Sequence, residues 1–301
     1  MIAEARKRSL GREIWKNRQK YVLMLPFLVV FSIFVIVPIL TSVCLSFTDF
    51  NMLQTPRFTG LSNYIRMFLD DDVFVIAVRN TLIFAVLTGP LSYFLGFFLA
   101  WMINDLPPRF RWVLTLLFYA PALASNIFYI WTYIFSGDMY GLVNSTLMRL
   151  GLLMEPVQWL TDSKYIMAVI IIVQLWMSLG TGFLAFIAGL QSVDGSMYEA
   201  GAIDGVRNRW QQLWYITLPV MKPMLMFGAV MQISASFSVS TVPMTLAGFP
   251  STDNAAATVV SHMIDHGILR YEMGYASAIA VVLFVVMVLF KQVISRILQQ
   301  D

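Results

Sequence analysis

The residues best suited to bind another surface lie in a polar stretch at 191–222, between two long apolar runs. Its first part, residues 197–205, reads Met-Tyr-Glu-Ala-Gly-Ala-Ile-Asp-Gly. Ser192 or Asp194 can cap a helix that starts near Gly195, because their side-chain oxygens can accept hydrogen bonds from its first amides. Small residues at 200–202 leave one side of that helix nearly bare, which allows a second surface to approach closely.

The same stretch carries charge and a bend. Glu199 and Asp204 add negative charge to the predicted helix, and Gly205 can end it by adopting a left-handed conformation. A second helical piece is predicted over 207–215, and the prolines at 219 and 223 end it or begin the next apolar run. We therefore expect a short helix, a bend and another short helix outside a membrane.

Two histidines have the spacing of a metal site. His262 and His266 are the only histidines, and a separation of four residues places both on one face of a helix. No third ligand is evident in their loop, so a solvated loop helix or a partner contact is favoured over a metal site. The acidic run 70–72 could suggest calcium, but its position before an apolar run favours a capping role at the polar interface.

Polar side chains inside the apolar runs form another candidate site. Residues 232–241 read Gln-Ile-Ser-Ala-Ser-Phe-Ser-Val-Ser-Thr, near the middle of one run. Such groups are poorly placed against lipid, so they are predicted to line an interior path or to hydrogen-bond between helices. Neutral donors and aromatic rings suit a sugar; the predicted path residues are Asn126, Tyr129, Gln174, Trp176, Gln232, Ser234, Ser236 and Ser238.

Enzymatic motifs are absent from the sequence. It contains no Gly-x-x-x-x-Gly-Lys-Ser/Thr segment, which would cradle nucleotide phosphates. It also contains no Gly-x-Ser-x-Gly or His-Glu-x-x-His segment. We therefore predict a non-catalytic chain that holds no cofactor of its own.

The composition places the chain in a membrane. Hydrophobic residues make up 58% of the sequence and charged residues 12%, about half the charged share of a soluble domain. The mean hydropathy is +0.73. The net charge of +3 is small and unevenly distributed, and it gives no indication of nucleic-acid binding. Cys44 is the only cysteine, so an intrachain disulfide is excluded.

Six segments are long and apolar enough to span a bilayer, which takes about 20 residues. They are 21–48, 75–103, 111–135, 165–190, 223–247 and 274–294. The sequence thus predicts an all-α, polytopic membrane protein with a basic arm at 1–20, a transmembrane domain at 21–294 and a tail at 295–301. The first apolar run is too long for a signal peptide and is predicted to be retained.

The distribution of basic residues predicts the orientation. Fourteen of the twenty Lys and Arg residues lie in the arm, in the connector near residue 109, in the polar stretch, and at Lys291 and Arg296 near the C-terminus. The positive-inside rule then places both termini and the stretch 191–222 in the cytoplasm. The arm is also predicted to lie against anionic lipid.

The stretch 191–222 resembles the EAA loop of ABC importer permeases, specifically the carbohydrate-uptake type related to the maltose system. Ten residues separate Gly205 from Ile216, one more than in the common family form, which leaves the pitch of the second helical piece open. The residues that match the family pattern are Glu199, Ala200, Gly201, Asp204, Gly205, Ile216, Leu218 and Pro219.

The resemblance extends over about 21–294. It includes Phe58-Thr-Gly-Leu-Ser-Asn-Tyr64, Asn80-Thr81, Gly141 with Asn144, and Gly274-Tyr-Ala-Ser-Ala278. It implies a type I ABC importer permease fold in a bacterial inner membrane. It also implies that the chain pairs with a second, homologous permease, and that two ATPase subunits, which bind ATP and Mg²⁺, dock on the EAA loop. An extracytoplasmic solute-binding protein and a carbohydrate substrate complete the implied system.

Two other functions were weighed. An ion-coupled secondary transporter is the main alternative, although the absence of acidic residues deep in the apolar runs argues against proton coupling. An intramembrane enzyme is not supported, because the sequence shows no combination of catalytic residues. Dependence of uptake on ATP or on an ion gradient separates the first two.

Overall fold

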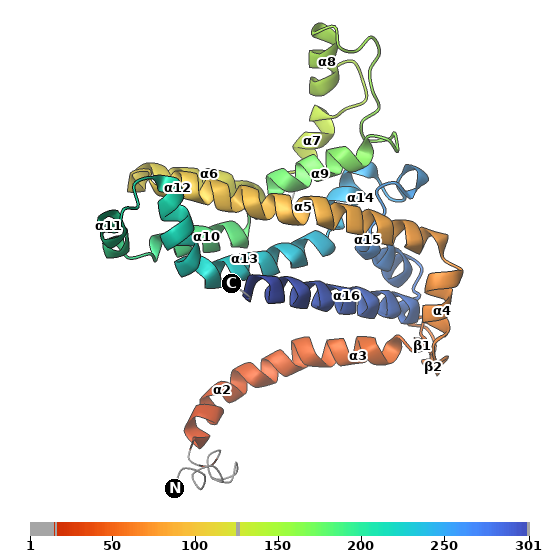
Figure 1. Cartoon of the computed structure of the whole chain (residues 1–301). Coiled ribbons are helices and arrows are strands. Elements are labelled where there is room, and N and C mark those ends of the chain that lie inside the picture. The colour runs from red at the N-terminus through yellow and green to blue at the C-terminus, as the bar shows by residue number, and fades with distance from the viewer. Residues whose placement is uncertain (1–14, 16, 125–126, 300–301) are drawn as a thin grey trace.

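The computed structural model describes residue 15 and residues 17–124 and 127–299. Within them, strands are limited to β1 (Thr48–Asp49) and β2 (Arg57–Phe58), an antiparallel pair. The same residues contain five helical stretches long and apolar enough to cross a membrane. These are Arg18–Leu45, Asp72–Asn104, Ile166–Gln191, Arg209–Ala247 and Met273–Arg296. The all-α, polytopic architecture predicted from the sequence is confirmed (Figure 1).

The centre of the molecule is a bundle of long helices (Figure 1). Helices α5 (Asp72–Asn104), α10 (Thr181–Gln191) and α13 (Leu218–Phe237) pack against one another, and α16 (Met273–Gln299) packs on α13. Small residues allow the close approach of α10 and α13, as is common between membrane helices. A Cβ at Gly228 would lie 2.4 Å from the ring of Phe186, so glycine is required there.

The first helical stretch lies partly outside this bundle. It comprises α2 (Arg18–Phe31), a π-helical turn η1 (Ser32–Ile36) and α3 (Val37–Leu45). Helix α3 packs on α16, whereas α2 curves away from the bundle (Figure 1). None of the residues of α2 is buried, so this helix leaves an apolar surface for lipid or another chain.

The predicted span 111–135 is not one continuous helix. Helix α6 (Pro108–Leu123) ends at Ala124, whose backbone is extended, and α7 (Tyr129–Ile134) follows after the break. Pro121 in the last turn of α6 offers no amide for a helical hydrogen bond, which weakens the helix just before the break. The sequence-based boundary was wrong here because hydropathy does not register a break between two apolar helices.

Two further predicted spans are interrupted. The segment 165–190 contains α9 (Ile166–Met177) and α10, with a break before Thr181. The segment 223–247 contains α13 and α14 (Thr241–Ala247), with a break at 238–240. At the second break the hydroxyl of Thr258 donates to the carbonyl oxygen of Val239 at 2.8 Å. This bond satisfies one backbone group freed by the interruption, as a membrane interior requires.

Short elements join the long helices at one end of the bundle. They are α4 (Ser62–Leu69), η3 (Thr252–Asn254), α15 (Val259–Ile264) and η4 (Asp265–Leu269), while α8 (Leu142–Arg149) projects away from the bundle (Figure 1). Asn80 holds one connection in place: its Nδ2 donates to the carbonyl oxygens of Asn254, Ala255 and Ala257 at 3.0–3.2 Å. Thr81 Oγ1 accepts from the Val259 amide at 2.9 Å, so both residues position this loop.

Two other residues from the family-like stretches have similar structural roles. Asn63 Nδ2 donates to the carbonyl oxygens of Ser46 and Thr48, both at 2.9 Å. A Cβ on Gly274 would lie 2.0 Å from the carbonyl oxygen of Thr48. The start of α16 therefore touches the chain that leaves α3, and only glycine fits at the contact.

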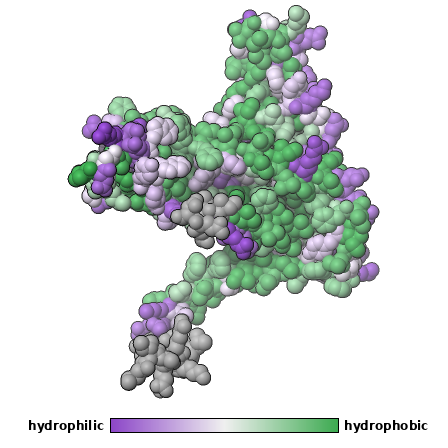
Figure 2. Space-filling model, in the orientation of Figure 1, coloured by the Kyte–Doolittle hydropathy of each residue, from purple (hydrophilic) through white to green (hydrophobic). Residues whose placement is uncertain are grey.

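Hydrophobic side chains cover the sides of the bundle, and hydrophilic ones gather near its ends and on the projecting α8 region (Figure 2). Helix α11 (Gly195–Ile203) and α12 (Arg209–Gln212) lie at the end of the bundle opposite α4 (Figure 1). Helix α2 begins, and α16 ends, toward that same end (Figure 1).

Candidate functional site

Helix α11 forms as predicted. Asp194 is its N-cap, and the carboxylate accepts a hydrogen bond from the Ser196 amide at 3.0 Å. This bond favours the charged form and holds the pKa of Asp194 below its ordinary value. The helix ends at Ile203, and Gly205 follows with φ +95°, the left-handed conformation predicted for it. A side chain at this position would be strained, although no atom lies within 4 Å of its Cβ site.

The three small residues of α11 differ in burial. Gly201 is buried, and a Cβ there would lie 2.6 Å from Cδ1 of Ile216. Ala200 and Ala202 are exposed. The expectation that all three residues present one face to another surface therefore needs correction, because Gly201 admits Ile216 of the same chain.

The outer side of α11 is exposed and partly apolar. Glu199 and Asp204 are both exposed. Ile203 is 88% exposed and Met197 is 42% exposed, although both are apolar. These apolar side chains are thus open at an end of the molecule where hydrophilic side chains gather (Figure 2).

The second half of the loop is helical over a longer distance than predicted. Asn208 and Gln211 form a capping box at the start of α12. The helix continues through the π-helical turn η2 (Leu213–Thr217) directly into α13. Pro219 was predicted to end this helical piece or to begin the next span, and the second alternative holds. Pro219 lies in the first turn of α13 just after the π turn, so its missing amide interrupts little regular α-helix.

The π turn also accounts for the unusual spacing of the loop. In this turn the Leu218 amide donates to the carbonyl oxygen of Leu213, five residues earlier. A π turn, with its bond over five residues, takes up one residue more than an α turn. It therefore accommodates the tenth residue between Gly205 and Ile216 without a break in the helix.

Three side-chain contacts connect the loop to the bundle. The hydroxyls of Tyr198 and Thr217 lie 2.9 Å apart, which joins α11 to η2. Arg209 pairs with Asp105, in the connector that follows α5. The Arg209 guanidinium also lies 4.6 Å from the ring centre of Trp101 on α5. Displacement of the loop would therefore act on both α5 and α13.

The predicted path residues fall into separate groups. Gln232 and Ser236 line one cavity of about 270 Å³ between α5, α13 and α16, with Tyr93, Phe94 and Phe290. Tyr93 was not identified from the sequence, because its position facing α13 depends on helix packing. The Ser236 hydroxyl donates to the Gln232 carbonyl oxygen at 2.8 Å, so it is used within its own helix.

The remaining predicted path residues lie elsewhere. Ser234 donates to the carbonyl oxygen of Val230, and Ser238 is exposed at the break after α13. Gln174 and Trp176 are half-buried on α9, where Trp176 lies 5.4 Å from Trp131, measured between ring centres. Tyr129 is exposed on α7, and Asn126 lies outside the described residues. The structure thus brings together Gln232 and Ser236, and does not place the other path residues in their cavity.

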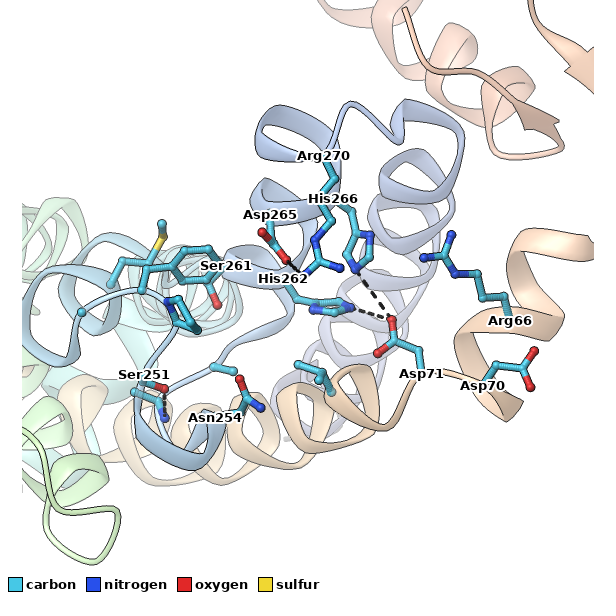
Figure 3. Close-up of a pocket in the computed structure, with 17 residues that line it drawn as sticks. Arg66, Asp70, Asp71, Ser251, Asn254, Ser261, His262, Asp265, His266 and Arg270 are labelled. Carbon is cyan, nitrogen blue, oxygen red and sulfur yellow. Dashed lines mark hydrogen bonds and ion pairs between the residues drawn. The ribbon is translucent and has the colours of Figure 1, made fainter.

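A buried polar cluster lies at the opposite end of the bundle (Figure 3). Asp71 caps α5, as the acidic run predicted: its Oδ1 accepts from the Phe74 amide at 2.8 Å. Its Oδ2 accepts from the hydroxyl of Tyr275 at 2.6 Å and lies 2.8 Å from Nε2 of His262. Burial alone would raise the pKa of Asp71, but these hydrogen bonds outweigh it and lower the pKa.

The second histidine belongs to the same cluster. His266 Nδ1 lies 2.7 Å from Oε2 of Glu272, which also pairs with Arg66 at 3.0 Å. Burial lowers the pKa of His266, and the nearby Glu272 opposes that effect only in part. The interpretation of His262 and His266 as a solvated loop helix was wrong, since both are buried. Their contact with Asp71 was not predicted, because about 190 residues separate them from it in the sequence.

Residues 92–301 match the protein-family model described as binding-protein-dependent transport system inner membrane component. The chain belongs to this family. It is a multi-pass inner-membrane protein and the permease part of a binding-protein-dependent transport system, as the resemblance implied. This transporter family is consistent with a non-catalytic role.

Named relatives support this assignment. The permease is 34% identical to the lactose transport system permease protein LacF of Rhizobium radiobacter, over 68% of each chain. It is 30% identical to the arabinooligosaccharides transport system permease protein AraP of Bacillus subtilis (strain 168), over 95% of this chain and 90% of that one.

A solved structure confirms the predicted fold. The permease matches one chain of a bacterial alginate ABC transporter, solved in complex with an alginate pentasaccharide-bound periplasmic protein. The TM-score is 0.77 and the identity 24%, over 96% of this chain and 98% of that chain. The type I ABC importer permease fold is therefore established for this chain.

Proposed function

We propose that this permease forms half of the translocation pathway of an ATP-driven carbohydrate importer, and that separate ATPase subunits drive it through α11. The single observation that carries this proposal is the open apolar tip of α11, with Ile203 88% exposed beside the charged Glu199. Apolar surface in contact with water is unfavourable, so a protein partner that covers it is stabilised. ATP and Mg²⁺ belong to that partner.

The other half of the pathway would be a second permease of the same family. Helix α2 curves away from its own bundle and buries none of its residues there (Figure 1). Packing against another membrane chain would give this helix the contacts that its own bundle does not supply. A heterodimer or homodimer of permeases therefore suits the shape of the first helical stretch.

The proposed substrate is a carbohydrate. Relatives in this family are named for the transport of lactose and arabinooligosaccharides, and the matching solved structure belongs to an alginate transporter. The cavity between α5, α13 and α16 is lined almost wholly by apolar atoms, with Tyr93, Phe94 and Phe290 in its wall. Such a wall suits the apolar faces of sugar rings. An extracytoplasmic solute-binding protein would deliver the sugar at the α4 and α15 end.

The mechanism follows from the contacts of the loop. Closure of the ATPases moves α11, and the Tyr198–Thr217 contact and the packing of Ile216 on Gly201 pass this movement to α13. The Arg209–Asp105 pair passes it to the end of α5. Because α5 and α13 are packed together with α10, they move as a unit and change the side on which the pathway opens.

Substitution of Gly205 tests the role of the loop. Gly205→Val forces a β-branched side chain into the left-handed region, which costs about 1–3 kcal/mol and reshapes the bend after α11. We expect transport and transport-coupled ATP hydrolysis in proteoliposomes to fall at least tenfold, with membrane insertion retained. Gly151→Val is the matched control, since Gly151 has φ +71° and equally open surroundings but lies in the α8–α9 connection. Equal losses in both variants would contradict a coupling role.

The energy source and orientation can be tested separately. Uptake driven by ATP and insensitive to ionophores supports the proposal, whereas dependence on an ion gradient favours a secondary transporter. In a Cys44→Ser background, Ser196→Cys on α11 should react with an impermeant thiol reagent only after cells are opened. Thr146→Cys on α8 should react from outside intact cells. The reverse pattern would contradict the proposed orientation.

A further inference from the structure

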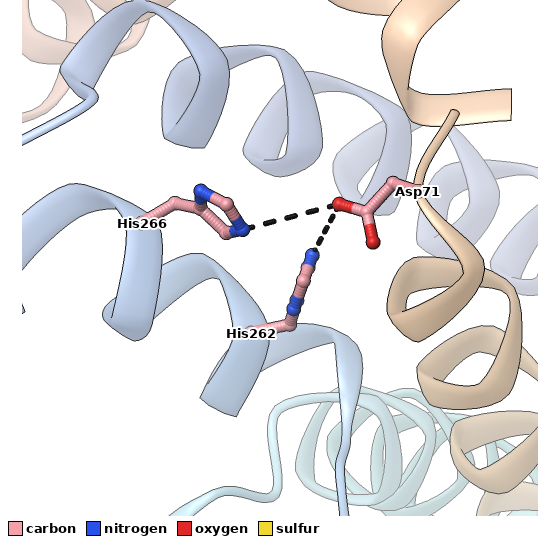
Figure 4. Close-up of side chains that lie close together, drawn as sticks. All are labelled: Asp71, His262 and His266. Atoms are coloured by element: carbon pink, nitrogen blue, oxygen red, sulfur yellow. Dashed lines mark hydrogen bonds and ion pairs between the residues drawn. The ribbon is translucent and has the colours of Figure 1, made fainter. Parts of the chain in front are cut away.

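We infer that Asp71, His262 and His266 form a binding site for a divalent transition-metal ion, of which Zn²⁺ is the best-suited representative. Their ligand atoms all lie within 4.8 Å of one another (Figure 4). The donors come from the start of α5 and from the α15–η4 segment, 191 residues apart in the sequence. This site lies at the opposite end of the bundle from α11, and it is independent of the proposed ATPase contact.

The distances between donors fit a tetrahedral ion. His262 Nε2 lies 2.8 Å from Asp71 Oδ2, and His266 Nε2 lies 3.9 Å from the same oxygen. Ligands about 2.0–2.1 Å from a tetrahedral Zn²⁺ are about 3.4 Å apart, between these two values. Small rotations of the two rings would bring all three donors to that spacing. The Nε2 atoms of His262 and His266 both point toward the Asp71 carboxylate (Figure 4).

The surrounding groups hold the ligands in the orientation that a metal needs. Glu272 bonds Nδ1 of His266 at 2.7 Å, which leaves Nε2 of that ring directed at Asp71. A carboxylate behind a histidine is the usual outer partner of a zinc ligand. Asp71 is fixed through Oδ1 by its cap on the Phe74 amide, so Oδ2 has a defined position.

The charge and space around the site also suit a cation. Arg66 is paired with Glu272 and Arg270 with Asp265, so both nearby arginines are already neutralised. A cavity of about 310 Å³ borders the three ligands, with room for a water molecule as the fourth ligand (Figure 3). Two imidazole nitrogens and one carboxylate favour zinc-like ions over Ca²⁺, which takes six to eight oxygen ligands.

Metal titration of the full chain tests this site. The chain is purified in detergent without a histidine tag, stripped with EDTA, and titrated with Zn²⁺ against a competing chelator and with Co²⁺ by visible absorption. We expect one Zn²⁺ per chain and a tetrahedral Co²⁺ spectrum, both lost in the double variant His262→Gln/His266→Gln. Asp71→Asn should also abolish binding while keeping the α5 cap, since Asn is an equally good cap.

Two further variants sharpen the result. Asp70→Asn alters the exposed neighbouring carboxylate and should bind Zn²⁺ like the parent. Glu272→Gln should weaken binding about 10- to 100-fold, as expected for an outer partner of a ligating histidine. Absence of saturable binding in the parent, or undiminished binding in the double histidine variant, would overturn the inference.

X-ray absorption of the zinc-loaded parent provides a test that does not depend on any variant. The expected shell contains two imidazoles and oxygen donors, without sulfur. A sulfur donor, from Cys44 or from a methionine such as Met244 at this cavity, would overturn the assignment.

Discussion

The two ends of the helix bundle differ in which kind of side chain they bury and which they expose. At the α11 end, apolar Ile203 is almost fully exposed, while Glu199 and Asp204 lie open beside it. At the α4 and α15 end, polar His262 and His266 are 5% and 2% exposed and are bonded to acidic side chains. Apolar groups are thus left outside at one end, and polar groups are enclosed at the other.

This difference separates an end where the chain satisfies its own polar groups from an end where an apolar side chain stays exposed. A buried polar group is costly unless its hydrogen bonds are made within the protein, and the Asp71 cluster makes them. An exposed apolar tip becomes favourable only when another surface covers it. Substitutions at the α4 and α15 end should therefore change the stability of the chain, and substitutions at the α11 end should change its association.

The largest effect is expected for Gly274→Val. A Cβ at this position overlaps the Thr48 carbonyl oxygen, a backbone atom that cannot move aside without shifting α3 from α16. We expect a loss of about 3 kcal/mol in unfolding free energy, at the upper end for overpacking, measured by thermal unfolding in detergent. Gly195→Val, at an open position on α11, is the control and should unfold like the parent. Equal destabilisation by Gly274→Val and Gly195→Val would contradict the idea that the two ends differ in their effect on stability.

A smaller loss of stability is expected for Tyr275→Phe. The substitution removes the hydroxyl that donates to Asp71 Oδ2 at 2.6 Å and leaves the buried ring in place. A hydrogen bond to a charged group contributes about 1.5–3 kcal/mol, so the unfolding midpoint should fall clearly. Tyr140→Phe, on an 82% exposed side chain, should leave it unchanged. An unchanged midpoint in Tyr275→Phe would show that the cluster adds no stability.

Ile203→Asp should leave the chain folded and weaken its association with the ATPase. The charge replaces an apolar contact at the tip of α11, and we expect about a tenfold loss of affinity, or about 1.4 kcal/mol. Quantitative co-purification of the ATPase with the permease measures this change. Leu53→Asp is a closely matched control, because Leu53 is also 88% exposed but lies at the other end. Equal retention of the ATPase by both variants would argue against docking on α11.

The smallest effect is expected for Asp194→Ala. It removes the N-cap of α11, which is worth about 1 kcal/mol to a helix. Hydrogen exchange should accelerate at the amides of residues 196–198, while global unfolding stays the same. Asp194→Asn keeps the acceptor and should exchange nearly as slowly as the parent. Unchanged exchange in Asp194→Ala would show that α11 is held by its packing on Ile216 alone.

Short-range patterns in the sequence were sufficient to predict much of the structure of the stretch 191–222. A cap at Ser192 or Asp194, the start of α11 and the left-handed Gly205 were predicted, and the structure selects Asp194; each depends on residues close together in the chain. The π turn at 213–217 and the burial of Gly201 were not predicted. Both depend on how α11 packs against the start of α13.

Predictions for the interior of the helix bundle failed more often, because they too depend on contacts between distant residues. Apolar length located the helical stretches, but the breaks after Leu123, Met177 and Phe237 fall inside the predicted spans 111–135, 165–190 and 223–247. Eight side chains were assigned to a shared path by their polarity, and the structure joins only Gln232 and Ser236 in one described cavity. Polarity shows that a side chain needs a partner; it does not identify that partner.

The sequence alone determined that this chain is a helical membrane protein with a short capped helix and a bend in its polar stretch, because hydropathy and capping residues act over one helix or less. Only the tertiary structure decided that Asp71 meets His262 and His266, and that Gly274 touches the chain leaving α3. Those contacts join residues up to about two hundred positions apart. They are fixed by the packing of whole helices, which no local pattern in the sequence specifies.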